Sequence, residues 1–198
     1  MTALLIIDVQ NDFLPGGSLA VPDGDQIIPV INQLIPDYDL VVATQDYHPA
    51  GHKSFAANHA DKKVGDLVEL DGLQQVLWPT HCVQGTPGAD FSDELDLREI
   101  DEVIQKGTDP EIDSYSGFFD NGHRKGTGLA ELLRNRSVTA VDIVGLATDY
   151  CVRFTALDAI VEGFQTRVLK DGCRGVNLQP GDDERALAEV RSKGGTIH

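Results

Sequence analysis

The chain has 198 residues, enough for one ordinary domain with a buried core, and 41% of them are hydrophobic, too many for a disordered chain. It carries 32 acidic residues against 16 Lys and Arg, a formal net charge of −16. That balance argues against a nucleic-acid or anionic-membrane partner, because such binding relies on clustered basic side chains. The apolar runs are far shorter than a membrane span, and no leader pattern precedes the first expected strand, so we expect a cytoplasmic protein.

Apolar runs alternate with amphipathic segments along the chain. In chain order we expect a strand over 3–9, a helix over 26–34, strands over 40–44 and 103–106, a helix over 128–136, a strand over 140–145, a helix over 148–161, a strand over 166–169 and a helix over 182–193. This alternation predicts a three-layer α/β fold, a Rossmann-like, mainly parallel sheet with helices on both faces.

The whole of 1–198 is expected to form a single domain, because no repeat or linker interrupts it. The segment from Tyr47 to Val103 shows few strong elements, and a stretch of that length in a compact domain is usually functional or holds structure that is hard to read. Thr148 is expected to be the N-cap of the helix that follows it.

Reactive side chains follow the expected strands at their carboxyl ends. Asp8 follows the first strand, Asp46 and His48 follow the second, Lys106 ends the third, and the turn 147–151 follows the fourth. In open parallel sheets, ligand sites form beyond the carboxyl ends of the strands. We therefore expect these side chains to share one site.

One candidate group is Asp8, Lys106 and Cys151. A cysteine reacts as its thiolate, which a place in the first helical turn and a neighbouring positive charge would stabilise. Asp8 could move the thiol proton if burial raises its pKa. Taken singly, each residue is more often structural: a packing cysteine, a loop-capping aspartate and a surface lysine. Cys82 and Cys173, the latter expected in a loop, are expected to pack, and no CxxC pair indicates a disulfide framework.

A second candidate group is Asp46-x-His48 together with His81. One carboxylate and two neutral imidazoles suit Zn²⁺, Fe²⁺ or Mn²⁺ and leave positions open for water and substrate. His52 and Ser54 are near enough in the sequence to add a fourth contact. Loop histidines bonded to backbone carbonyls are the alternative interpretation.

Several blocks of sequence contain these residues or lie close to them. They are DVQNDF from Asp8 and GGSLAV from Gly16, DYHP from Asp46 and HxSF from His52, WPTHCVQGT from Trp78, KG from Lys106 and DSYSGF from Asp113, and GLATDYCV from Gly145. In this order they resemble the isochorismatase-like cysteine hydrolases, and among them the nicotinamidase family. The resemblance covers nearly the whole chain and thins toward its C-terminus. The Asp-x-His and Trp-Pro-x-His-Cys patterns are the ones that single out nicotinamidases.

The resemblance implies Asp8 as proton acceptor, Lys106 as its charged neighbour and Cys151 as nucleophile. It also implies a cis peptide before Ala147, with the N–H groups of Ala147 and Cys151 forming an oxyanion hole.

The resemblance further implies one divalent metal ion, with Zn²⁺ favoured and Fe²⁺ or Mn²⁺ as alternatives. Its implied ligands are Asp46, His48 and His81, with Ser54 as a second-tier ligand or water-binding group. The residues expected around the substrate ring are Phe13, Trp78, Tyr115 and Ala147.

The implied activity is hydrolysis of nicotinamide to nicotinate and ammonia through a thioester, a step of NAD salvage, with pyrazinamide as a further substrate. One alternative is another amidase of the superfamily that acts on a carbamoyl or maleamate-like substrate and needs no metal set. Another is a metal-binding or regulatory protein that keeps the fold without catalysis. Isochorismatases proper lack the cysteine, so Cys151 counts against that activity. The oligomeric state is left open, including a homo-oligomer.

Overall fold

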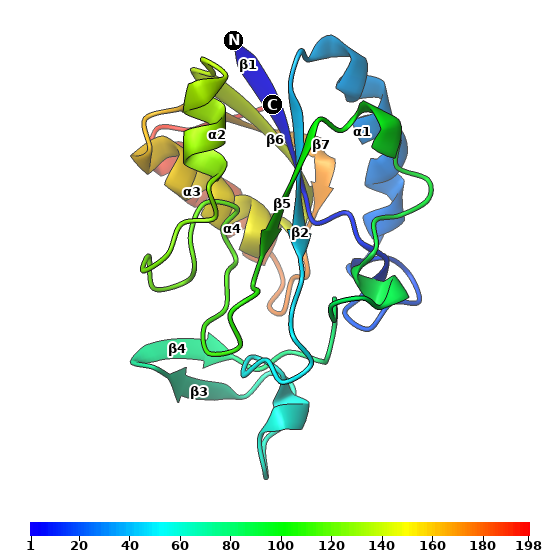
Figure 1. The fold of residues 1–198 in the computed structure, drawn as a ribbon, viewed down its shortest axis with the longest axis vertical. Helices are drawn as coiled ribbons and strands as arrows, with labels where there is room; N and C mark the ends of the chain where they lie inside the picture. The colour runs from blue at the N-terminus through cyan, green and yellow to red at the C-terminus, as the bar shows by residue number, and fades with distance from the viewer.

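The computed structural model describes residues 1–198, which build a six-stranded sheet with helices on both faces (Figure 1). The strands lie in the order β5-β2-β1-β6-β7-β8, and every neighbouring pair is parallel. Their bounds are β1 Thr2–Ile7, β2 Val41–Asp46, β5 Glu102–Lys106, β6 Ala140–Leu146, β7 Gln165–Arg174 and β8 Thr196–Ile197. The expected α/β architecture is confirmed.

Two hydrophobic cores lie on opposite faces of the sheet. Side chains alternate along a strand, so Leu5 and Ile7 of β1 enter one core while Leu4 and Ile6 enter the other. Burial on both faces explains why β1 is an uninterrupted apolar run. The first core is covered by α2, α3 and α4, and the second by α1 (Figure 1).

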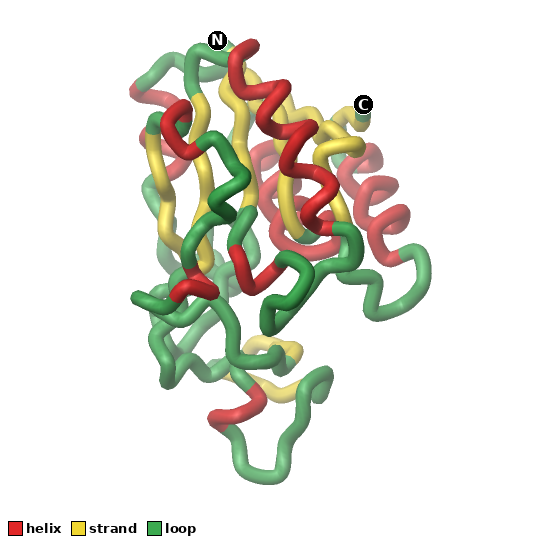
Figure 2. Tube along the Cα trace, turned by 90° about the vertical axis from the view of Figure 1, so that its right-hand side faces the viewer, coloured by secondary structure: helices red, strands yellow, loops and turns green.

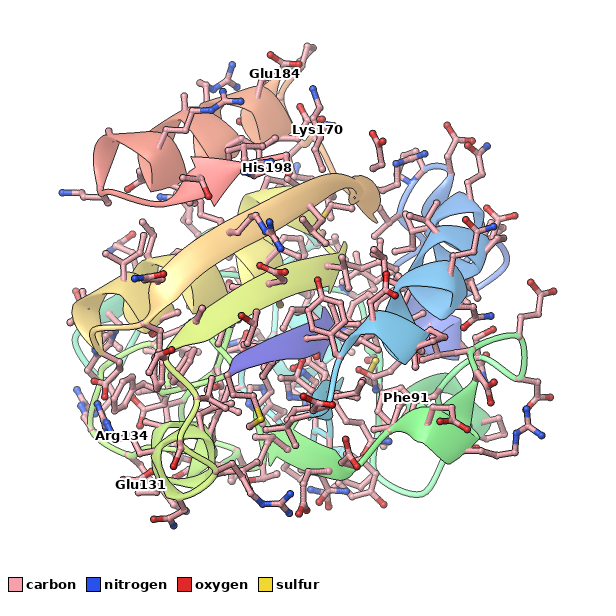
Figure 3. All side chains as sticks on the ribbon, turned by 90° about the horizontal axis from the view of Figure 1, so that it is seen from above. Phe91, Glu131, Arg134, Lys170, Glu184 and His198 are labelled. Carbon is pink, nitrogen blue, oxygen red and sulfur yellow. The ribbon has the colours of Figure 1, made fainter.

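The α-helices are short, and their bounds are α1 Ile28–Leu34, α2 Leu129–Asn135, α3 Arg153–Val161 and α4 Asp182–Ser192. Figure 3, seen from above, shows the strands side by side, with Glu131 and Arg134 of α2 on the outer surface. No helix has both the length and the apolar character needed to span a membrane.

The segment between β2 and β5 contains a hairpin that the sequence interpretation missed. Its antiparallel strands are β3 Leu67–Leu70 and β4 Leu73–Val76, and it lies beyond the carboxyl ends of the main sheet (Figures 1 and 2). Asp71 and Gly72 form its turn, both with positive φ. An Asp-Gly turn between short apolar segments is the usual signal of such a hairpin, and it could have revealed this one.

Two local expectations were wrong. Thr148 is not a side-chain N-cap: the extended residue Ala147 precedes a π-helical turn, Thr148–Val152, and no side chain caps it. The Ala147 carbonyl accepts hydrogen bonds from the N–H groups of Tyr150 and Val152, so the helical hydrogen bonding begins one residue earlier than expected. Cys173 lies in β7 rather than in a loop, because that strand continues past an irregularity in its pairing with β6.

Candidate active site

Four adjacent strands end at one edge of the sheet and deliver the candidate residues there (Figure 1). Asp8 follows β1, and Ala147 follows β6. Asp46 and Lys106 are the last residues of β2 and β5 and are register partners. The structure thus brings together side chains that lie far apart in the sequence, as the strand-end rule predicts.

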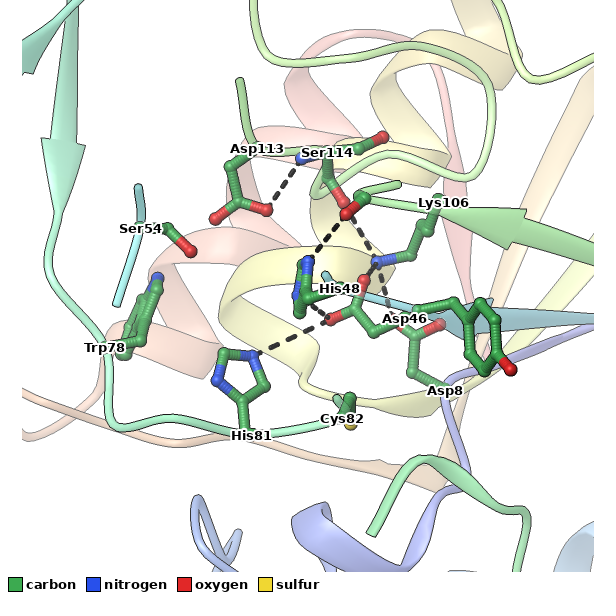
Figure 4. A network of polar contacts seen from close by, with 12 residues as sticks. Asp8, Asp46, His48, Ser54, Trp78, His81, Cys82, Lys106, Asp113 and Ser114 are labelled. Atoms are coloured by element: carbon green, nitrogen blue, oxygen red, sulfur yellow. Dashed lines mark hydrogen bonds and ion pairs between the residues drawn. The ribbon is translucent and has the colours of Figure 1, made fainter. Parts of the chain in front are cut away.

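Lys106 is the centre of a buried polar network (Figure 4). Its Nζ lies 2.9 Å from Oδ2 of Asp8, 2.5 Å from Oδ1 of Asp46 and 3.5 Å from Sγ of Cys151. Nζ also donates to the carbonyl of Ser114 at 3.0 Å. One ammonium group therefore holds two carboxylates and the thiol in a fixed arrangement, as a set of groups that exchange a proton requires.

The two sides of the Asp8 carboxyl group have different surroundings. Oδ1 accepts the Thr44 hydroxyl at 2.7 Å, whereas Oδ2 forms the ion pair with Nζ of Lys106. Burial raises the pKa of Asp8, and Lys106 opposes the shift only in part. A carboxyl group whose pKa is raised accepts a proton more readily than an ordinary aspartate does.

Burial also governs the thiol of Cys151. It raises the thiol pKa well above its usual value, although Lys106 acts to lower it. The positive charge of Lys106 thus opposes the loss of hydration at the thiol but does not outweigh it. Side-chain oxygens of Asp8 and Asp46 and the sulfur of Cys151 lie within 4.8 Å of one another. A carboxylate is therefore close enough to accept the thiol proton when Cys151 reacts.

The turn after β6 carries Cys151 into the site. Its peptide between Leu146 and Ala147 is cis, as the resemblance implies. Asp149 anchors the turn, since its carboxylate accepts the N–H groups of Val176 at 2.9 Å and Asn177 at 2.7 Å. The role of the Ala147 and Cys151 N–H groups as an oxyanion hole stays a prediction.

Asp46, His48 and His81 form a buried group whose ligand atoms lie within 4.8 Å of one another (Figure 4). The Nδ1 atoms of the two histidines lie 2.8 Å from the Gly107 carbonyl and 2.7 Å from the Pro79 carbonyl. Because a carbonyl only accepts, each Nδ1 must donate, so in the neutral imidazole it is Nε2 that carries the lone pair for a metal ion.

Those Nε2 atoms face Oδ2 of Asp46, at 3.5 Å from His48 and 4.0 Å from His81. Two imidazole nitrogens and one carboxylate oxygen converging on one point fit Zn²⁺, Fe²⁺ or Mn²⁺. The donor set and its tautomers therefore suit a divalent metal ion.

The electrostatics of this group are dominated by Asp46. Burial acts to raise its pKa, but Lys106 and then His48 outweigh burial and hold it below its usual range. The Asp46 carboxylate in turn overcomes the effect of burial on His48 and raises its pKa. Burial and the neighbouring His48 lower the pKa of His81 to about 4, so His81 is neutral at pH 7 and its Nε2 is available as a ligand.

Ser54 and His52 lie beside this group and bind each other. The Ser54 hydroxyl lies 2.7 Å from Nδ1 of His52, and Nε2 of His52 is buried without a hydrogen-bond partner. His52 also forms a second close group with His48 and Asp113. The Ser54 side chain thus contacts His52, and its role as a second-tier ligand stays a prediction.

A mainly apolar pocket opens beside Cys151. Eleven residues line it, eight of them hydrophobic, and they include the predicted set Phe13, Trp78, Tyr115 and Ala147. The indole Nε1 of Trp78 donates to the Tyr115 hydroxyl at 3.1 Å, which fixes both rings. A flat aromatic ligand suits such walls.

Sequence reasoning missed several residues around this site. Leu19, Tyr150 and Val176 complete the apolar lining. The Asp113 carboxylate also lines the pocket and accepts the Ser114 N–H at 2.7 Å. Gln10, which is fully buried, binds the backbone of Asp46. Gln10 and Asp113 belong to the family-like blocks, so their place in those blocks was the available signal.

Comparison with known proteins agrees with this geometry. The model of the Isochorismatase domain family matches residues 2–198. The nicotinamidase of Escherichia coli strain K12 is 47% identical over 201 residues, covering 99% of this chain and 93% of that protein. The solved structure of an Acinetobacter baumanii nicotinamidase and pyrazinamidase is also 47% identical, with a TM-score of 0.96 and coverage of 99% and 94%. The Pyrococcus horikoshii pyrazinamidase, solved in complex with zinc, is 43% identical, with a TM-score of 0.83 and coverage of 100% and 98%.

Proposed function

The chain belongs to the isochorismatase domain family, and from that premise we propose that it is a cysteine amidohydrolase that converts nicotinamide to nicotinate and ammonia. The observation that carries the proposal is the joining of two buried groups in one site. Cys151 lies beside Asp8 and Lys106, and Asp46 links them to His48 and His81. Nicotinamidases of other organisms are similar in sequence to this chain over nearly its full length.

The chemistry starts with a proton transfer from Cys151 to Asp8. As Oδ2 of Asp8 accepts the proton, Sγ forms a bond to the amide carbon, and the carbonyl oxygen becomes an oxyanion. N–H groups of Ala147 and Cys151 would stabilise that oxyanion, a contribution of about 2.7–4 kcal/mol per donor in other enzymes. Asp8 then returns its proton to the amide nitrogen, the C–N bond breaks, and ammonia leaves a thioester on Cys151.

Water then hydrolyses the thioester. Asp8 takes one proton from the water as the water oxygen bonds to the acyl carbon. The C–S bond then breaks, and Asp8 passes this proton to Sγ, which releases the acid and restores the thiol. Lys106 stays charged throughout, because Asp46 and Asp8 raise its pKa against the effect of burial. Its fixed charge keeps the carboxyl group of Asp8 oriented in both steps.

The metal ion would be held by Asp46, His48 and His81, and Zn²⁺ is the ion we propose, since the zinc-bound Pyrococcus horikoshii protein is 43% identical. When bound, such a cation supplies a Lewis-acidic attachment point for the ring nitrogen of the substrate. Phe13, Trp78 and Tyr115 would enclose the ring, and Ala147 would lie beside the carboxamide. The same contacts suit pyrazinamide, whose ring has the same shape.

The test of this proposal is ammonia release from nicotinamide by metal-stripped and zinc-restored protein. We expect turnover with zinc, its loss after chelation, and its return when zinc is added back. Turnover that is insensitive to chelation would contradict the metal assignment. Turnover of a maleamate-like amide without turnover of nicotinamide would favour the alternative amidase instead.

Gly107 provides a separate test of the metal group. A Cβ at this position would lie 2.3 Å from Cε1 of His48, which is a steric clash. We therefore expect Gly107→Ala to displace the imidazole. The affinity for Zn²⁺, measured by competition with a chromogenic chelator, should fall by about tenfold or more. The control is Gly163→Ala, because Gly163 also has a positive φ but has open space around the added methyl group. Equal zinc affinity in both variants would contradict the assignment of His48.

A further inference from the structure

Gln10 completes the sheet where its central strand ends too early. Strand β1 pairs with β2 only as far as Ile7 and Thr44, and at Asp8 the backbone leaves the sheet with φ of 50°. Strand β2 continues to Asp46, which still pairs with Lys106 of β5 on its other side. Both the N–H and the C=O of Asp46 therefore face a place in the buried interior where no strand lies.

The side chain of Gln10 occupies this place and imitates a peptide group. Its Oε1 accepts the Asp46 N–H at 2.8 Å, and its Nε2 donates to the Asp46 carbonyl at 2.8 Å. The second hydrogen of Nε2 goes to the carbonyl of Ala89, also at 2.8 Å. Gln10 is fully buried, so water cannot replace these hydrogen bonds if they are lost.

We propose that Gln10 is a positioning residue for the metal ligand Asp46 and thereby sets the affinity of the site for its divalent ion. The carboxylate of Asp46 must reach Lys106 with one oxygen and face His48 and His81 with the other. A small rotation of its backbone would break that double contact, and Gln10 holds the backbone on the side opposite β5. The inference rests on the proposed function only in that the Asp46 group binds metal.

The sequence provides a matched control in Gln45. Its Nε2 donates to the same Ala89 carbonyl, at 2.9 Å, but its side chain has no hydrogen bond to the backbone of Asp46. Gln10→Met and Gln45→Met each remove a carboxamide and keep a side chain of similar length. Comparison of the two variants separates the contact with Asp46 from the contact with Ala89.

The experiment measures Zn²⁺ binding to metal-stripped, folded protein by competition with a chromogenic chelator, so it needs no turnover. We expect Gln10→Met to bind zinc about 10–100-fold more weakly than the wild type, as for other residues that orient metal ligands, and Gln45→Met to stay within about twofold. In ammonia-release assays, excess zinc should restore the turnover of Gln10→Met with little change in KM for nicotinamide. A purely structural role would lower the yield of folded protein without changing the zinc affinity of the folded fraction.

Unchanged zinc affinity in Gln10→Met, or an equal loss in Gln45→Met, would overturn the proposal. If Gln10→Met does not fold, Gln10→Glu poses the same question, because it keeps the length of the side chain and removes the amide donors. We expect the same loss of zinc affinity, and wild-type affinity would count against the proposal. Failure of the proposed function would appear separately, as a wild type that binds no zinc or releases no ammonia.

Discussion

Cys151→Ala should lower ammonia release from nicotinamide by about 10⁴-fold or more, because no other group can form the acyl intermediate. The methyl group of alanine keeps the small volume of the side chain, while Sγ, 3.5 Å from Nζ of Lys106, is lost. Turnover should be measured with zinc present, so that the effect is not confused with loss of the metal ion. A variant that retains more than about a tenth of wild-type turnover would rule out the thioester route.

Cys173→Ala is the matched control for this variant. Cys173 is equally buried, but it lies in β7, where its Sγ faces the carbonyl of Leu169 at 3.4 Å. Burial raises its pKa to about 12, so it is a packing thiol at neutral pH. We expect Cys173→Ala to keep wild-type turnover per folded molecule and to lose only a modest part of the free energy of unfolding.

Lys106→Met is expected to reduce both activity and stability. It removes the ammonium group that contacts the carboxylates of both Asp8 and Asp46, and leaves these two buried groups to repel each other. Breaking a buried ion pair from one side costs about 3–5 kcal/mol of unfolding free energy. Turnover should fall by about 10³-fold or more, since the proton acceptor and the nucleophile both lose their orientation.

Denaturant unfolding of the metal-free protein measures the stability effect, and Lys53→Met is its control. Lys53 pairs with Glu111 at the surface, where both side chains are about half exposed. A surface pair of this kind contributes about 0–1 kcal/mol. If the two lysine variants lose the same free energy of unfolding, the charge of Lys106 does not hold the site together.

Much of the fold could be predicted from local pattern. The apolar runs of β1 and β6 can be recognised from the sequence alone, because burial on both faces leaves no polar position in either strand except Thr2 at the start of β1 and Asp142. Strand β8, Thr196–Ile197, is too short to give a periodic signal and exists only because β7 pairs with it. The true length of β7 was hidden for a similar reason, since its later residues pair with β6 across an irregularity.

Most of the residues that form the site could also be predicted from the sequence. Residue types and their order identified Asp8, Lys106 and Cys151 as one group, and Asp46, His48 and His81 as another. The strand-end rule placed both groups in one site, but it did not show which residue joins them, because nothing in local spacing relates a residue of β2 to one of β5. In the structure Asp46 belongs to both, with one carboxylate oxygen on Lys106 and the other facing the histidines.

The acidic composition led us to expect no nucleic-acid or anionic-membrane partner and indicated no substrate, whereas the motifs indicated the class of reaction. The missing part was the order of the strands. Placing β5, β2, β1 and β6 side by side puts Asp46 beside Lys106 and gives it Gln10 as a substitute for a strand neighbour, 36 residues away. Such contacts depend on which backbone groups are left unpaired when the sheet assembles, and no local pattern in the chain encodes that.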